Sequence, residues 1–281
     1  MADEGSLRGR VCLITGANTG IGRATATELA RRGARLLLAC RSLDKAHPVA
    51  EAIRAESKND AVEVVELDLA RFASIRRAAE VLLARDLPIH LLINNAGLAA
   101  RGLTADGFEL VFGTNHLGHF LLTNLLLDRL RASAPARVVT VSSRAHYKAS
   151  GIDFEAVRRP TASLTALPEY SVSKLANVLF SAELARRLGG AGVTTGSLHP
   201  GVIASDIWRR IPWPIRPIAL GFMSSLEEGA GTVVDAAVNP ARAAETGRYY
   251  HEGQERQPSR LAQDPELARR LWEESVRWCG L

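Results

Sequence analysis

The stretch of residues 11–22, VCLITGANTGIG, constrains the fold of this chain more than any other part of its sequence. A short apolar run ends abruptly at Thr15, and a glycine-rich turn then opens into a segment with helical spacing. Gly16 permits a tight turn, Gly20 removes a Cβ where a phosphate would approach, and Gly22 allows close packing of helix on strand. This order aims the free N–H groups and the positive dipole end of the helix at an anion. The pattern predicts a dinucleotide site, with a glycine-rich structural turn as the alternative.

Apolar runs and helical patterns alternate along the rest of the chain. We expect strands at 11–14, 35–41, 62–67, 89–93, 137–141, 193–198 and 247–250, and helices at 23–32, 43–57, 74–84, 110–131, 170–188, 227–238 and 265–278. Continuously apolar strands that alternate with helices indicate a parallel sheet covered on both faces. Right-handed crossovers then give an α/β fold, a Rossmann-type doubly wound sheet with the nucleotide at its carboxyl edge. No linker composition divides the 281 residues, so we expect one domain, with a nucleotide-binding half at about 8–145 and a catalytic half at about 146–281.

Charge and composition exclude several other classes of protein. The net charge of +5 is spread as arginine pairs over expected helix faces, without the basic runs interleaved with aromatics that are typical of nucleic-acid binding. The first ten residues lack the apolar core of a signal peptide, and no segment has the length and uniformity of a membrane span. Cys12, Cys40 and Cys279 lack metal-ligand spacing and fit a reducing compartment. We expect a cytoplasmic protein with no nucleic-acid partner and no transmembrane segment.

Short polar motifs follow the ends of expected strands or lie on expected helices. They are Asp68, Asn94-Asn95-Ala96-Gly97, Asn115, Ser143, Tyr170-x3-Lys174 and Pro200-Gly201. Together with the glycine turn, these motifs resemble, in order and spacing, those of the short-chain dehydrogenase/reductase family over essentially the whole chain. Within that family the sequence most resembles the retinol dehydrogenase group, through TGANTGIG, LACR, NHLGHFLLTNLLL, SKLANVLF and HPGV.

The resemblance implies a nicotinamide dinucleotide bound at the carboxyl edge of the sheet. From the residue patterns and the resemblance together, the residues expected to contact the dinucleotide are Gly16, Asn18, Thr19, Gly20, Ile21, Gly22, Arg41, Ser42, Asp68, Leu69, Asn95, Ala96, Gly97, Tyr170, Lys174, Pro200, Gly201, Ile203 and Ser205. It also implies a homodimer through the helices that carry Asn115 and Tyr170.

Reduction of a carbonyl needs a hydride donor, an acid for the developing alkoxide, and donors that polarise the carbonyl. Tyr170 is the candidate acid, although the ordinary pKa of tyrosine, about 10, is too high for ready proton exchange near neutrality. Lys174 lies one helical turn later, where its charge would favour the phenolate; an ordinary exposed pair is the alternative. The resemblance implies that Ser143 holds the substrate oxygen, that Lys174 also binds the nicotinamide ribose, and that Asn115 anchors a water that relays protons to Lys174. Strand alternation does not separate Ser143 from Ser142; the resemblance favours Ser143.

The end of the second strand indicates which dinucleotide is bound. NAD-preferring enzymes commonly place an acid there to bind the ribose 2′-OH. Here the strand ends in Ala39-Cys40-Arg41-Ser42, and no acid follows before Asp44. Arg41 can pair with a 2′-phosphate, and Ser42 can donate a hydrogen bond to it. We therefore predict NADP(H), with a solvent-exposed arginine as the alternative reading of Arg41.

Three histidines near these motifs raise the question of a metal. His116 and His119 flank Asn115, and His199 precedes the Pro-Gly motif, but no cluster of Cys or carboxylate residues accompanies them. We interpret them as helix and strand-end histidines and expect no metal. Residues 144–169, between the catalytic serine and tyrosine, read as a long polar loop whose path relative to the site the sequence leaves open.

Residues 203–225 form an apolar segment that we expect to contact the substrate. With Ser143, Trp208 and Trp213 are the candidate substrate residues. Prolines in this segment argue against a long regular helix and favour a lid, and the core of a helix pair is the alternative. Its arginines predict peripheral contact with an anionic membrane surface.

These observations predict an NADP(H)-dependent oxidoreductase that interconverts a small lipophilic alcohol and its aldehyde or ketone, with Tyr170 as acid and base. The alternative is a catalytically silent NADP-sensing regulator on the same fold. Sensors of that kind typically lose the Ser/Tyr/Lys set, whereas this chain retains all three residues.

Overall fold

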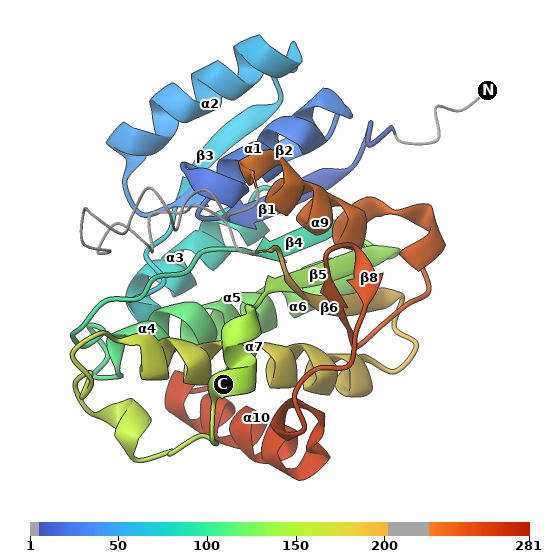
Figure 1. Ribbon diagram of the computed structural model, residues 1–281. Coiled ribbons are helices and arrows are strands. Elements are labelled where there is room, and N and C mark those ends of the chain that lie inside the picture. Colours follow the sequence, from blue (N-terminus) through green and yellow to red (C-terminus); the bar gives the residue numbers. More distant parts are fainter. Residues whose placement is uncertain (1–5, 202–224) are drawn as a thin grey trace.

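The computed structural model describes residues 6–201 and 225–281. One eight-stranded sheet runs through the molecule in the order β3-β2-β1-β4-β5-β6-β7-β8 (Figure 1). Neighbouring strands are parallel up to β7, and β8 pairs with β7 antiparallel. The predicted doubly wound α/β sheet is confirmed. Ile203, Ser205, Trp208 and Trp213 lie outside the described residues, so the expectations on them stay predictions.

The strands are β1 (Val11–Thr15), β2 (Arg35–Cys40), β3 (Val62–Glu66), β4 (Leu91–Asn94), β5 (Ala136–Val141), β6 (Val193–His199), β7 (Arg248–His251) and β8 (Gln254–Glu255). The α-helices are α1 (Gly20–Arg31), α2 (Leu43–Ser57), α3 (Phe72–Leu83), α4 (Leu110–Phe112), α5 (Gly118–Leu125), α6 (Leu127–Ala132), α7 (Leu167–Leu188), α9 (Leu226–Val238) and α10 (Pro265–Cys279). Every predicted strand is present within a few residues at each end, and so is every predicted helix except the one at 110–131, which is divided. The two-residue β8 is too short to leave such a pattern.

Two apolar clusters cover the two faces of the sheet. Helices α1, α2 and α9 pack on one face, and α3, α5, α7 and α10 lie on the other side (Figure 1). Strand alternation divides the side chains between them: Leu13 and Leu37 belong to one cluster, and Ile14, Leu36 and Leu38 to the other. Parallel strands covered on both faces lack a polar side, which is why their sequences are apolar throughout. Because the strands from β1 to β7 are parallel, those that carry site motifs all end at the same edge of the sheet.

The prediction of a single long helix at 110–131 is wrong, because the helix is interrupted twice. Residues Gly113–Leu117 form a π-helix between α4 and α5, and the helix is interrupted again at Leu126 before α6 begins. The Gly118 N–H bonds the carbonyl of Gly113, five residues earlier. A Cβ on Gly118 would lie 2.6 Å from the carbonyl oxygen of Leu69, so this helix approaches the strand end after β3 as closely as glycine allows. π-Turns of this kind often occur at functional sites.

The segment between β5 and α7 is not the polar surface loop that its composition suggests. It contains short 3-10 helices at Arg144–Lys148 and Ala156–Arg158, and it buries Ile152, Phe154 and Val157 in the core. The carbonyl of Val157 accepts a hydrogen bond from the N–H of Glu109 at 2.8 Å. The Phe154 ring lies 6.1 Å from that of Trp278. A few apolar residues in a polar stretch thus anchor the insertion against α4 and α10.

Helix α10 packs on the outer side of α5 and α7. The ring of Trp272 lies 4.9 Å from Phe120 of α5 and 5.9 Å from Phe180 of α7. His116 Nε2 lies 3.1 Å from Ser275 Oγ. Helix α10 thus covers part of the surface of the helices through which a homodimer was expected. The dimer stays a prediction. Within the described part of the chain, no helix is long and apolar enough to cross a membrane.

Candidate active site

Tyr170 and Lys174 lie one turn apart on α7, beside the carboxyl end of β5. The Lys174 side chain is buried, with 2% of its surface exposed, and its Nζ donates a hydrogen bond to the carbonyl of Val141 at 2.9 Å. The same Nζ lies 5.5 Å from the centre of the Tyr170 ring, and Tyr170 itself is half-buried. The alternative of an ordinary exposed pair is therefore wrong: the lysine is held against the sheet.

The structure separates the two neighbouring serines that the sequence pattern leaves equivalent. Ser142 is buried, and its hydroxyl donates to the main-chain carbonyl of Lys174 at 2.7 Å. Ser143 is half-buried, and its side chain interacts with that of Tyr170. Extended backbone at Ser143 turns successive side chains to opposite sides, so only one of the pair faces the tyrosine. Ser142 has a structural bond, and Ser143 lies at the site.

Burial sets the protonation states of this pair. It raises the pKa of Tyr170 to about 12, while the interaction with Ser143 works in the opposite direction. It also lowers the pKa of Lys174 to about 8. The expectation that Lys174 lowers the pKa of Tyr170 is not met in this geometry, because the ammonium is directed to the Val141 carbonyl and desolvation penalises the phenolate. The tyrosine is thus kept protonated, which is the form that a proton donor needs.

Asn115 lies in the π-helix, close to Lys174 but engaged with backbone. Its Oδ1 accepts from the N–H of Leu98 at 2.9 Å, and its Nδ2 donates to the carbonyl of Leu98 at 3.0 Å and to Ser173 Oγ at 3.1 Å. A Cβ on Gly97 would lie 3.5 Å from Lys174 Nζ and 3.6 Å from Asn115 Oδ1. Asn115 therefore fixes the chain after β4 next to α7, and its role in a water relay stays a prediction.

The glycine turn after β1 has the shape that a dinucleotide diphosphate requires. Thr19, at the N-cap of α1, makes no side-chain cap bond, and the first turn of the helix holds no acidic residue. Gly20 has φ of +55°, and no atom lies within 4 Å of where its Cβ would be. A Cβ on Gly22 would lie 2.4 Å from the Gly16 carbonyl and 2.5 Å from Asn95 Nδ2. A helix N-terminus with uncapped N–H groups beside an open glycine fits an anionic group.

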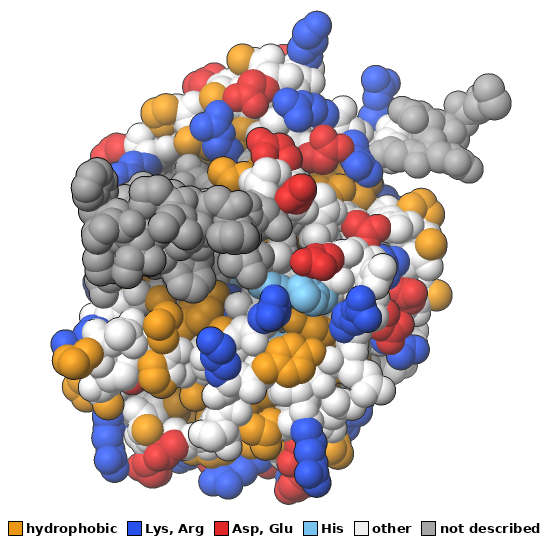
Figure 2. Space-filling view, in the orientation of Figure 1, with side chains coloured by type: hydrophobic (Ala, Val, Ile, Leu, Met, Phe, Trp, Pro, Cys, Tyr) orange, Lys and Arg blue, Asp and Glu red, His pale blue; other side chains and the backbone are white. Residues whose placement is uncertain are grey.

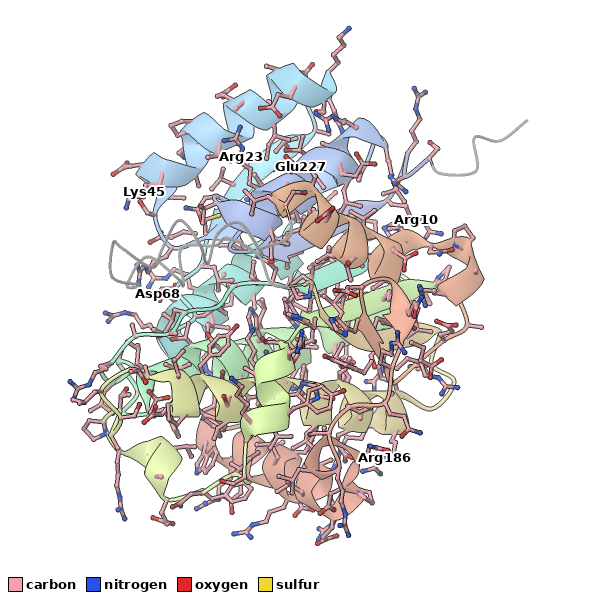
Figure 3. The ribbon with its side chains drawn as sticks, in the orientation of Figure 1. Arg10, Arg23, Lys45, Asp68, Arg186 and Glu227 are labelled. Carbon is pink, nitrogen blue, oxygen red and sulfur yellow. The ribbon has the colours of Figure 1, made fainter. Side chains whose placement is uncertain are left out.

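The residues expected at the adenosine end surround the ends of β2 and β3. Arg41 is exposed, and no ion pair joins it to a carboxylate within the described residues. Ser42 stands at the N-cap of α2 without using its hydroxyl as a cap. Asp68 is half-buried and accepts from the N–H of Ala70 at 3.0 Å; Figure 3 shows it on the same side of the molecule as Lys45 of α2. No described residue hydrogen-bonds the side chains of Arg41 and Ser42, which fits a role in holding a ligand.

Among the described residues, Asn95, Leu69, Pro200 and Gly201 follow the carboxyl ends of strands at the same edge of the sheet. Asn95 donates from its side chain to the Thr15 carbonyl at 2.8 Å, so it joins the end of β4 to the glycine turn. Leu69 is buried beneath Gly118, and Pro200 and Gly201 follow β6. Sequence reasoning did not foresee a groove of about 860 Å³ that begins at 18–20 and continues between α1 and α9. Arg23 and Glu227 line it, from α1 and α9 (Figure 3).

The three histidines that raised the metal question are all buried. Burial lowers the pKa of His116 to about 3, of His119 to about 4 and of His199 to about 3. The His199 ring lies 4.9 Å from that of His251 on the neighbouring strand. Figure 2 shows pale blue histidine atoms at the surface near the middle of the face in view. In the parts of the chain that the structure describes, no group of three or more His, Cys, Asp or Glu side chains is placed to hold a metal ion.

Comparison with known proteins agrees with this architecture. A family model described as short chain dehydrogenase matches residues 10–213. Retinol dehydrogenase 13 of Homo sapiens is 43% identical over 288 residues, which cover 99% of this chain and 87% of that protein. Retinol dehydrogenase 12 of Homo sapiens is 45% identical over 284 residues, which cover 98% of this chain and 88% of that protein.

Solved structures with the same fold include two with clear sequence similarity. An uncharacterized protein from Mycobacterium Paratuberculosis superposes with a TM-score of 0.80 at 37% identity, over 99% of this chain and 96% of that chain. Pseudomonas aeruginosa RhlG, solved as an NADP active-site complex, superposes with a TM-score of 0.73 at 28% identity, over 89% of this chain and 97% of its own.

The close approach at Gly22 leads to a test with a matched control. We expect Gly22→Ala to lower the free energy of unfolding by about 1–3 kcal/mol, because its methyl would overlap the Gly16 carbonyl and Asn95. Gly231→Ala, also within a helix, meets nothing within 4 Å and should be neutral or stabilising by up to about 1 kcal/mol. Urea unfolding of both variants measures the difference. Equal changes in the free energy of unfolding would show that the glycine turn can accommodate a methyl group at residue 22.

Proposed function

The chain belongs to the short-chain dehydrogenase family, and we propose that it is an NADP(H)-dependent oxidoreductase that interconverts a lipophilic alcohol and its aldehyde or ketone. The family and the retinol dehydrogenase relatives make it an oxidoreductase that acts on CH–OH groups with a nicotinamide cofactor. One observation carries the proposed chemistry. Tyr170, with Ser143 beside it and the buried Lys174 one turn later, stands at the sheet edge where the glycine turn also opens.

Each member of this set has a defined task. When bound, the nicotinamide dinucleotide supplies the hydride for carbonyl reduction or accepts it in alcohol oxidation. Tyr170, with a pKa raised to about 12, holds its proton at neutral pH and donates it to the substrate oxygen. Ser143 donates a hydrogen bond to the same oxygen. Lys174 lies 5.5 Å from the centre of the Tyr170 ring, and its pKa, lowered to about 8, lets it exchange protons near neutrality.

The preference for NADP(H) rests on the end of β2. Cys40 is buried and offers no carboxylate to a ribose 2′-OH, and Arg41 and Ser42 follow it with side chains that no described residue hydrogen-bonds. A guanidinium and a hydroxyl at this place suit a 2′-phosphate. The NADP complex of RhlG is consistent with this choice.

The lipophilic substrate is proposed from the apolar segment 203–225 and from the names of the relatives. Both human relatives are called retinol dehydrogenases, and retinol is a long apolar alcohol. Trp208 and Trp213 are the aromatic residues proposed to contact such a substrate, and the arginines of the segment are proposed to bring it to a membrane surface. A cytoplasmic location stays a prediction; the three cysteines are free thiols and buried.

Replacement of Tyr170 tests the proton donor. Tyr170→Phe removes only the hydroxyl, so we expect kcat to fall more than tenfold while the Kd for NADPH hardly changes. Tyr147→Phe is the matched control, since Tyr147 is exposed and its hydroxyl bonds the Gln257 carbonyl. Steady-state kinetics and fluorescence titration give the two quantities. A variant that keeps more than about a tenth of wild-type kcat would remove Tyr170 from the acid role.

Replacement of Arg41 tests the cofactor. Loss of a charged partner of a phosphate costs about 1.5–3 kcal/mol, so Arg41→Ala should weaken NADPH binding by roughly 10- to 150-fold. NADH lacks that phosphate, and its affinity should stay within a factor of about two. Lys45→Ala, an exposed cation on the next helix, controls for general charge. Equal losses for NADPH and NADH would show that Arg41 has only a structural role.

A series of straight-chain aldehydes, with all-trans-retinal beside them, tests the substrate class. Each methylene buried in an apolar pocket contributes about 0.8 kcal/mol, which corresponds to roughly a fourfold rise in kcat/KM until the pocket is full. The assay follows the loss of NADPH absorbance at fixed cofactor concentration. A flat series, or a preference for short polar carbonyls, would exclude the lipophilic class and leave the oxidoreductase assignment in place.

A further inference from the structure

A set of buried hydrogen bonds joins the glycine turn to the π-helix through His119. Thr15, the last residue of β1, accepts at Oγ1 from the main-chain N–H groups of Asn95 and Ala96, both at 3.0 Å. His119 Nε2 lies 2.8 Å from the same oxygen, and His119 Nδ1 lies 2.9 Å from the Asn115 carbonyl. Thr15 and His119 are at most 1% exposed. Residues that are 104 positions apart in the sequence are thus in direct contact.

The chemistry of the partners determines every proton in this set. A carbonyl only accepts, so His119 Nδ1 must carry hydrogen to bond Asn115. Burial and the nearby charge of Lys174 lower the pKa of His119 to about 4, so the ring is neutral at pH 7 and Nε2 is an acceptor. The Thr15 hydroxyl, which already accepts two N–H bonds, donates its own proton to Nε2 at 2.8 Å, the nearer of its two acceptors, since the Ile93 carbonyl lies at 3.4 Å. One tautomer of His119 satisfies all the groups.

The same set continues into the catalytic helix. Asn115 holds Leu98 with both ends of its amide and also donates to Ser173 Oγ at 3.1 Å. Ser173 Oγ in turn donates to the main-chain carbonyl of Tyr170 at 2.8 Å. Ser173 also directly precedes Lys174. A continuous path therefore runs from the end of β1, through His119 and the π-helix, to α7.

We propose that His119 is a positioning residue, whose neutral ring holds the dinucleotide-binding turn and the catalytic side chains of α7 in one register. The proposal rests on the proposed function. Both bonds of the ring lie away from water, so removal of either leaves a buried polar group without a partner, which is costlier than the loss of an exposed bond. A shift of Thr15 moves Asn95 and Ala96 on the cofactor side, and a shift of the Asn115 carbonyl moves the neighbours of Lys174.

His116 provides a control that is matched in residue type and burial, and it lies in the π-helix that directly precedes α5. It lies three residues earlier in the chain, is 1% exposed, and its Nε2 lies 3.1 Å from Ser275 Oγ of α10. Its ring also packs on Phe112, Phe120 and Phe180, so its described contacts are with the helices and not with the glycine turn. Variants of the two histidines separate loss of packing, which both share, from loss of position, which only His119 should show.

The experiment compares His119→Phe and His119→Gln with His116→Phe in the full chain. We expect all three to lower the melting temperature. The His119 variants alone should weaken NADPH binding and lower kcat, each by about tenfold for His119→Phe and by less for His119→Gln, which retains one partner for Thr15. NADPH affinity of His116→Phe should stay within about twofold of wild type. Affinity is measured by calorimetry without substrate, so this readout does not depend on whether the enzyme turns over a lipophilic carbonyl.

Two further measurements complete the test. In nitrogen-15 NMR spectra of the full chain, His119 should carry hydrogen on Nδ1 only and should not titrate above about pH 5. In a double-mutant cycle with Thr15→Val, the two losses of NADPH affinity should not add, since both remove the same bond. His119 variants that lose stability without weakening NADPH binding, additive losses in the cycle, or an Nε2–H tautomer would each overturn the proposal. If the variants of His119 fail to fold, the tautomer of His119 in the wild-type protein still tests the proposal, because hydrogen on Nε2 would overturn it.

Discussion

The close approach of β1 to the chain after β4, at their carboxyl ends, is the constraint on which the rest of this structure depends. A Cβ on Gly16 would lie 2.9 Å from Ala96, and one on Gly22 would lie 2.5 Å from Asn95 Nδ2. The Thr15 hydroxyl oxygen accepts hydrogen bonds from the main-chain N–H groups of both Asn95 and Ala96. Because these atoms have no room to move, the start of α1 is fixed relative to the chain after β4 that leads to Asn115.

Burial, rather than a direct charge contact, determines the chemistry of the catalytic pair. The Lys174 ammonium is bound to a main-chain carbonyl, and the Tyr170 phenol is kept protonated by its half-buried surroundings. A lysine whose pKa is about 8 changes its protonation near physiological pH, whereas an exposed lysine would stay charged. The sheet edge therefore supplies a proton donor in its acid form and a cation able to exchange protons beside it.

Helix α10 supports the helices that carry the site. α10 covers α5 and α7 through Trp272, and the insertion before α7 is anchored by Phe154 against the same helix. These aromatic contacts support α7 on the side that faces α10. The residues that bear the chemistry are thereby fixed on rigid elements, while the apolar segment after Gly201 is the proposed source of substrate selectivity.

The sequence by itself determined the fold class and where the candidate site would assemble, because strand and helix periods are local and parallel strands end at one edge. Only the tertiary structure decided the rest. Ser143 was distinguished from Ser142 by the backbone carbonyl that Ser142 bonds, and the raised pKa of Tyr170 came from burial. The π-helix, the buried insertion and the contact of His119 with Thr15 depend on partners far along the chain. Burial and hydrogen-bond pairing are properties of the whole packed molecule, and no short pattern in the sequence contains them.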